Sequence, residues 1–391
     1  MLFPRDRMTP EQRIRVTLEG GTPDRVPVAP FIHYFAATYA GYTQADLWED
    51  HGAYRESMRR TFRDLGPWDA SFLLDAHGPV AMSFMIPMKA RIPGRDLPRN
   101  SSLQLVEEEI MRPEDYDWLA RQPSRLDRAV LGMFLRRLAL RIHDPLGRTL
   151  SGQLRMALEL ARNGVYNFMD VRMWQRWGVS VLYGMGLEAP FDTFSLARGL
   201  RHFSVDILGR PDEIRDAAQR MVPGFLLAAR LGCRATRVPR FVIMCHRSSN
   251  DFVSPRQFGS LAFPSLKEIC LSLIRDRIVP ILHCDGNWDK NLEYFLELPA
   301  GRFCLQFDGR TDIFRAVEIL KGHCTLFGDV PAGMLVLDGP DDVDRYCKRL
   351  ITKVGKNGAY ILGAGCEIPS DARPENVWAL IRAAVKYGYY D

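Results

Sequence analysis

A histidine, a cysteine and a carboxylate follow one another directly after an apolar run in the C-terminal half of the chain. The run at residues 278–282 ends in His283, Cys284 and Asp285. Apolar runs of this length are typical of buried parallel strands, and in parallel α/β folds the chemistry lies just beyond the carboxyl ends of the strands. Imidazole, thiolate and carboxylate are also groups that bind zinc. The segment therefore indicates an enzyme site, with zinc as a candidate metal.

Cys366 follows another apolar run, residues 359–363, and we expect it on the same face as His283. His283, Asp285 and Cys366 would offer zinc nitrogen, oxygen and sulfur ligands with one open position, which is a catalytic arrangement. A zinc-bound thiol is deprotonated and therefore nucleophilic at neutral pH. The alternative is that Cys284 and Cys366 are small buried thiols and that His283 is a hydrogen-bonded core histidine. The spacing is not Cys-x-x-Cys, so both interpretations stay open.

Polar side chains also follow other apolar runs. Asp75 and His77 come after residues 70–74, and His246 comes after residues 240–244. Each could bind substrate or metal, although capping of the next helix is the better explanation for Asp75 taken alone. Asp308 and Asp329 follow residues 303–307 and 324–328, in contexts that suit Asx turns. Together they would place two more carboxylates on the same rim, which favours a function.

These residues are positioned by a regular alternation of strands and helices. We expect strands at 26–31, 70–74, 240–244, 278–282, 303–307, 324–328 and 359–363, and helices at 265–277, 313–320, 341–354 and 374–387. A repeat of strand, helix and strand over roughly 30 to 40 residues indicates βαβ units. Such units predict an α/β fold, a (β/α)8 TIM barrel in one domain over residues 1–391. A doubly wound open sheet is the rival, but no Gly-x-Gly-x-x-Gly motif follows an early strand.

Residues 79–165 interrupt this alternation. Prolines at 79, 87, 93 and 98 disfavour a continuous helix over residues 79–112, where we expect strands and loops, including a short strand at 103–107. Residues 113–165 have a helical pattern. Insertions of this kind usually build or cover an active-site mouth, and we expect the same of this segment.

The composition is that of an ordinary globular protein. The chain has 391 residues, of which 47% are hydrophobic and 25% charged, and its net charge of +5 comes from interleaved acidic and basic residues. We therefore expect no nucleic-acid partner. Without an apolar run of membrane-spanning length or a secretory signal, we expect no membrane partner and a cytoplasmic location, in which the eight cysteines are reduced thiols.

Several short stretches resemble the uroporphyrinogen decarboxylase superfamily. In chain order they are GTPDRVP at 21–27, DFVSP at 251–255, HCDGN at 283–287, GDVP at 328–331, GCEIP at 365–369 and PENV at 374–377. They span nearly the whole chain. The resemblance implies a (β/α)8 barrel with its site at the C-terminal mouth.

Within the superfamily, the sequence resembles the corrinoid-dependent methyltransferases more than the decarboxylases of the haem pathway. The decarboxylases carry an N-terminal Arg-Gln-Ala-Gly-Arg stretch that grips substrate carboxylates, whereas residues 31–38 here contain no arginine. The methyltransferases bind zinc through a His-x-Cys pair and a distant cysteine. These positions correspond to His283, Asp285 and Cys366, and a shifted loop would make Cys284 the ligand instead.

The resemblance implies a zinc-dependent methyltransferase. It would move a methyl group between a small methylated compound (a thiol, an ether or a phenolic O-methyl) and a corrinoid carried by a partner protein. We expect a proton to be handled by one of His77, His246 and Asp308, and substrate to be bound by Asp75, Asn287, Asp329 and Glu367. One alternative is a decarboxylase that grips carboxylates with Arg25 and Arg198 and stabilises a developing iminium with Asp75. The other is a non-catalytic corrinoid- or tetrapyrrole-binding protein.

Overall fold

Parallel strands form the centre of the molecule. The computed structural model describes residues 3–74 and 76–390. Its main sheet has six parallel strands in the order β10–β9–β8–β7–β6–β5, and a parallel pair joins β1 to β4. The strands are β1 (Ala70–Ser71), β4 (Ser180–Val181), β5 (Met185–Glu188), β6 (Arg240–Cys245), β7 (Val279–Cys284), β8 (Cys304–Phe307), β9 (Thr325–Val330) and β10 (Tyr360–Ala364).

Residues 26–30 close these strands into a ring. The backbone N–H of Ala29 donates to the carbonyl of Leu362 in β10 at 2.8 Å, and the N–H of Asp69 donates to the carbonyl of Val28 at 2.9 Å. On the other side of β1, strand β4 continues through residues 182–184 into β5. The six-stranded sheet, β1 and the 26–30 segment therefore form a ring of eight strands. The fold is the predicted (β/α)8 barrel.

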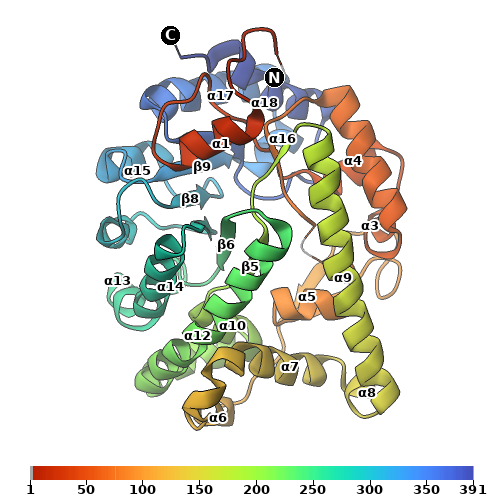
Figure 1. Ribbon diagram of the computed structural model, residues 1–391, viewed down its shortest axis with the longest axis vertical. Coiled ribbons are helices and arrows are strands. Elements are labelled where there is room, and N and C mark those ends of the chain that lie inside the picture. Colours follow the sequence, from red (N-terminus) through yellow and green to blue (C-terminus); the bar gives the residue numbers. More distant parts are fainter. Residues whose placement is uncertain (1–2, 75, 391) are drawn as a thin grey trace.

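Helices cover the outside of this ring (Figure 1). Those before the insertion are α1 (Pro10–Leu18), α2 (His33–Tyr39), α3 (Gln44–Glu49) and α4 (His51–Leu65). Those after it are α10 (Pro190–Arg198), α11 (Leu200–Gly209), α12 (Pro211–Thr236), α13 (Pro255–Gln257), α14 (Phe263–Arg275), α15 (Ile313–Leu320), α16 (Ala332–Leu337), α17 (Pro340–Lys353) and α18 (Pro374–Tyr387). Over the described ranges, the helices include none with the length and apolar character needed to cross a membrane.

The segment predicted as an insertion is mainly helical. It contains α5 (Pro79–Met85), β2 (Lys89–Arg91), β3 (Gln104–Val106), α6 (Glu114–Ala120), α7 (Val130–Ile142), α8 (Asp144–Gly147) and most of α9 (Leu150–Arg176). The expected strand at 103–107 is present as β3, paired antiparallel with β2. The prediction of only strands and loops over 79–112 was wrong for α5, because Pro79 occupies the first turn of that helix, where it costs no hydrogen bond. Figure 1 shows the long helix α9 running along one side of the molecule.

A buried network of ion pairs lies at the end of the barrel where the strands begin. The Arg25 guanidinium lies 2.7 Å from Asp69 and 2.9 Å from Asp6, and Arg13 lies 2.6 Å from both Asp24 and Asp69. The side chains of Arg25, Arg13, Asp6 and Asp69 are fully buried. Arg25 is therefore engaged in the core, at the opposite end from the mouth, and does not reach a substrate there.

Candidate functional site

A cavity of about 450 Å³ lies at the carboxyl ends of the barrel strands. Its polar wall comes from Glu188 at the end of β5, His246 after β6, His283 and Asp285 at the end of β7, and Cys366 and Glu367 after β10. The rest is largely apolar, and much of that surface comes from the first part of residues 79–165, namely Met82, Met85, Ile86, Met88, Leu103 and Leu105. The cavity therefore combines metal-ligating groups with an apolar chamber.

Strand alternation explains why His283 faces the cavity and Cys284 does not. In the parallel register, His283 lies between Met244 of β6 and Gln306 of β8, whereas Cys284 is aligned with Cys245 and Phe307. Successive side chains of a strand point to opposite faces. Cys284 is completely buried and does not line the cavity, so the alternate ligand of the sequence prediction lies on the wrong face of β7.

Two histidines and one carboxylate approach one another closely in this cavity. His283 Nε2 lies 3.0 Å from Asp285 Oδ1, and His246 Nε2 lies 3.4 Å from Asp285 Oδ2. One ligand atom from each of these residues falls within 4.8 Å of the other two. Cys366 adds a thiol whose Sγ is 3.8 Å from His283 Nε2. The structure thus brings the three predicted metal ligands together and adds His246, for which we had expected a proton-handling role.

Neighbouring side chains orient both imidazoles. His283 Nδ1 lies 2.9 Å from the amide oxygen of Gln306, and His246 Nδ1 lies 3.3 Å from Glu188 Oε1. Each contact occupies Nδ1 and leaves Nε2 directed at the cluster. A carboxylate or amide oxygen behind a ligating histidine is the usual support of a metal site, because it fixes the ring and its tautomer.

Burial and mutual charge set the ionisation of this cluster. Burial lowers the pKa of His283, but Asp285 and Cys366 outweigh it and raise that pKa well above its ordinary value. Burial raises the pKa of Asp285, but the His283 charge outweighs it and brings the pKa down to about 2. Burial lowers the pKa of His246 and raises that of Cys366. Without a cation, His283 and Asp285 are therefore an imidazolium–carboxylate pair.

The donor set fits a zinc ion. Ligand bonds of about 2.0–2.3 Å in a tetrahedron place neighbouring ligand atoms about 3.3–3.7 Å apart, close to the separations found here. Asp285 Oδ1 is buried, and its contact with His283 Nε2 at 3.0 Å lacks the geometry of a normal hydrogen bond, as expected of two atoms that would contact the same cation. His246, His283, Asp285 and Cys366 could therefore hold zinc between them.

The other predicted substrate-binding residues divide between the cavity and the surrounding loops. Glu367 lines the cavity, where its Oε1 accepts the N–H of Tyr34 at 2.8 Å. Asn287 instead braces its own loop, since its amide donates to Asp289 Oδ2 at 2.8 Å. Asp329 is buried outside the cavity lining, where it accepts the hydroxyl of Tyr346 from α17 at 2.9 Å. Asp75 lies outside the described residues.

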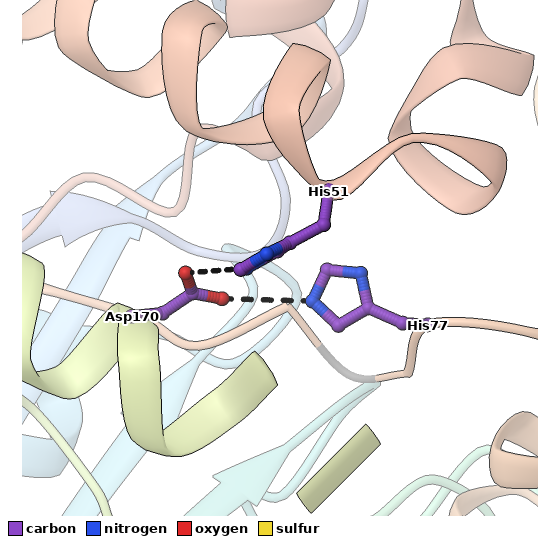
Figure 2. Close-up of side chains that lie close together, drawn as sticks. All are labelled: His51, His77 and Asp170. Carbon is purple, nitrogen blue, oxygen red and sulfur yellow. Dashed lines mark hydrogen bonds and ion pairs between the residues drawn. The ribbon is translucent and has the colours of Figure 1, made fainter. Parts of the chain in front are cut away.

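Two of the predicted proton carriers also lie outside the cavity lining. Asp308 accepts the backbone N–H of Gly286 at 2.8 Å and of Arg310 at 2.9 Å, so it holds two loops together as an Asx-type brace. His77 lies beside Asp170 instead, in a second cluster (Figure 2). The geometry therefore supports neither residue as a proton carrier at the His283 cluster.

Glu188 and Gln306 were not predicted as site residues from the sequence. Glu188 ends a strand that was not predicted, because Gly184 and Gly186 interrupt its apolar pattern. Glycine is needed at 186, since a Cβ atom there would lie 2.2 Å from a side-chain carbon of Val242. Gln306 was assigned to a strand, and only its alignment with His283 across β7 and β8 reveals its role.

Comparisons with known proteins agree with this architecture. A solved structure of a methyltransferase from Methanosarcina mazei superimposes with a TM-score of 0.68, covering 97% of this chain and 99% of that chain at 17% sequence identity. At this identity the likeness concerns the fold. No curated protein matches the sequence significantly. The family model of uroporphyrinogen decarboxylase (URO-D) matches residues 178–387, more than half of the chain and all of β4 to β10. The protein belongs to the uroporphyrinogen decarboxylase family.

Proposed function

We propose that the protein is a zinc-dependent methyltransferase that moves a methyl group between a small methylated compound and a corrinoid carried by a partner protein. The observation that carries this proposal is the meeting of His246, His283, Asp285 and Cys366 at the wall of an apolar cavity. The cavity of about 450 Å³ falls within the ~300–1,000 Å³ typical of small-molecule sites. A methyltransferase among the structural relatives is consistent with this proposal.

The four residues would hold zinc, and the cavity would hold the substrate beside it. In the demethylating direction, the bond between the methyl carbon and the heteroatom breaks. The electron pair of that bond stays on the heteroatom, and the methyl group passes to a nucleophilic corrinoid. When bound, zinc supplies positive charge that stabilises this electron pair.

The protein's own residues position the reaction and exclude water. Glu188 and Gln306 keep the two imidazoles in place. The apolar side chains of α5 and of residues 103–105 would surround the methyl compound and exclude water. Without water, the attraction between zinc and the charge that develops on the heteroatom is stronger. We assign the exchange of a proton with the heteroatom to Glu367, which lies on the cavity wall next to Cys366.

The decarboxylase alternative lacks the cations that it needs. Arg25 is locked in the buried network at the other end of the barrel, and Arg198 is engaged by Asp206 and Glu109. Arg247 lines the cavity but is already paired with Glu107. A substrate with several carboxylates would leave charges unpaired, at a cost of several kcal/mol each. This observation favours a neutral or singly charged methyl compound.

The test is a methyl-transfer assay with the full-length protein, zinc and chemically reduced cobalamin as the corrinoid. Methylated thiols, aliphatic ethers and methoxyphenols are supplied in turn, and methylcobalamin formation is followed by absorbance. We expect zinc-dependent transfer from at least one class, lost in His283→Ala and Cys366→Ser and retained in His202→Ala, a control at an exposed histidine. Decarboxylation of uroporphyrinogen without zinc, at about 1 per second, would overturn the proposal.

A further inference from the structure

A second cluster of metal-ligating side chains lies outside the cavity lining. His51 begins α4, His77 follows β1, and Asp170 lies near the end of α9. His51 Nε2 is 2.8 Å from Asp170 Oδ1, and His77 Nε2 is 3.5 Å from Asp170 Oδ2. Figure 2 shows each carboxylate oxygen directed at a different imidazole. Three elements far apart in sequence thus place two nitrogens and a carboxylate within 4.8 Å of one another.

The cluster is buried and its hydrogen bonding is incomplete. His77 is 1% exposed and Asp170 is fully buried. The contact between His77 Nε2 and Asp170 Oδ2, at 3.5 Å, is longer than a normal hydrogen bond, and neither atom has a well-formed hydrogen bond with the described residues, although each is shielded from solvent. Over residues 3–74 and 76–390, the ion-pair partners of Asp170 are the two histidines, with no lysine or arginine. Buried carboxylates are normally paired with a cation or bound to a metal, and a metal ion would supply the positive charge that no lysine or arginine brings to Asp170.

We propose that His51, His77 and Asp170 form a second metal site, which binds a divalent transition-metal ion, best matched by zinc. Two imidazoles and a carboxylate are ligands that zinc accepts, and its bond lengths require nitrogen–oxygen separations of about 3.3 Å. The separations of 2.8 and 3.5 Å lie on either side of that value. This inference does not depend on the methyltransferase proposal.

The position of the site gives it a structural role. One face of α9 presents Glu159, Asn163, Tyr166 and Asp170 to the segment that follows β1. Asn163 Oδ1 accepts the N–H of His77 at 2.8 Å, and Glu159 Oε1 accepts the N–H of Val80 at 2.6 Å. The Tyr166 ring stacks on His51, with centroids 4.0 Å apart. A metal bound by Asp170, His51 and His77 would add to the contacts of this helix face and fix α9 to the barrel.

The same contacts connect the second site to the cavity. Helix α5 begins at Pro79, two residues after His77, and carries Met82 and Met85 into the cavity wall. Fixing His77 therefore fixes the start of the helix that shapes the apolar chamber. The ion would hold residues 79–165 and α9 against the barrel and would not contact the substrate.

The experiment counts metal in a protein whose first site has been removed. Full-length protein carrying His283→Ala and Cys366→Ser is stripped with EDTA, reloaded with Zn²⁺ and desalted. Zinc per chain and the melting temperature are then measured. We expect about one zinc per chain, with a melting temperature that rises on loading. Adding Asp170→Asn should weaken zinc binding at least about 100-fold, because loss of a ligand costs more affinity than loss of a residue that only supports a ligand. It should also abolish the increase in melting temperature on zinc loading.

The matched control is Asp212→Asn, at an exposed aspartate on α12, which should leave zinc binding unchanged. His77→Gln provides a second variant if Asp170→Asn does not fold, as judged by circular dichroism of the metal-free proteins. A simple hydrogen-bonded histidine–aspartate–histidine triad would behave differently. It would bind no zinc in the background protein, and Asp170→Asn would lower stability equally with and without metal. Either of these results would overturn the proposal.

Discussion

His283 Nε2 and Cys366 Sγ lie 3.8 Å apart although 83 positions separate the two residues in the sequence. Strands β8 and β9 stand between β7 and β10 in the sheet, so a flat sheet would keep the two side chains far apart. Closure of the barrel brings them together, because side chains at the carboxyl ends of the strands converge on one mouth. This proximity makes a shared metal ion possible.

Gln306→Leu should weaken zinc binding at the His283 site about 10- to 100-fold, because His283 would lose the partner of its Nδ1. The measurement is zinc affinity by competition with a chromophoric chelator. Gln306→Glu, which keeps an oxygen acceptor at this position, should retain most of the affinity. An unchanged affinity in Gln306→Leu would show that Gln306 does not support the site.

Cys284→Ser should keep full zinc binding at the cavity, in contrast to Cys366→Ser, because Cys284 faces away from His283. The variant should nevertheless be less stable by about 1–3 kcal/mol, since a hydroxyl would replace a thiol in a fully buried position. Elemental analysis and urea unfolding of the two variants, side by side, measure both effects. Loss of zinc from Cys284→Ser would mean that the loop after β7 has a different register.

Arg25→Ala should lower the free energy of unfolding by about 3–5 kcal/mol, because it removes one of the two buried guanidinium groups of the network and leaves Arg13 to face Asp6, Asp24 and Asp69. Urea unfolding followed by circular dichroism gives the value. Arg345→Ala, which removes an exposed ion pair with Asp342, is the matched control and should cost less than about 1 kcal/mol. Equal effects of the two changes would contradict the structural role assigned to the buried network.

Asp329→Asn should stabilise the protein near pH 7. Burial raises the pKa of Asp329 from 3.8 to about 6, so the folded protein holds a proton that the unfolded chain releases between these values. The contribution of this group to stability is present below pH 3.8 and is lost as pH rises through 6. The loss is at most about 3 kcal/mol, at roughly 1.36 kcal/mol per pKa unit.

The amide that Asp329→Asn introduces would still accept the Tyr346 hydroxyl but would carry no charge. The difference in unfolding free energy between Asp329→Asn and wild type should therefore grow from about pH 4 to about pH 7. Urea unfolding of both proteins across this range measures it. A difference that does not change with pH would show that Asp329 titrates normally.

The sequence predicted the barrel because its strands are apolar runs at regular intervals. The helices at 313–320 and 374–387 were predicted at their observed bounds, since amphipathic periodicity and Pro374 define them clearly. The strand at 180–188 was missed, because its glycines serve close packing against β6 and interrupt the apolar pattern. The pattern itself gives no hint of that packing.

The candidate site was predictable only in part, and for a similar reason. His283, Asp285 and Cys366 follow apolar strands, so their types and positions single them out. Gln306 and Glu188 are recognisable only through contacts across neighbouring strands. The link between His77 and Asp170 depends on how α9 folds back along the barrel, and no local pattern encodes it.

The zinc content of the full-length protein shows whether His283 and Cys366 build a metal centre. Wild type, His283→Ala and Cys366→Ser are loaded with Zn²⁺, desalted and analysed for zinc and protein by mass spectrometry. Each variant should contain about one zinc per chain less than wild type, whatever the second cluster binds. Equal zinc content in the three proteins would contradict this prediction.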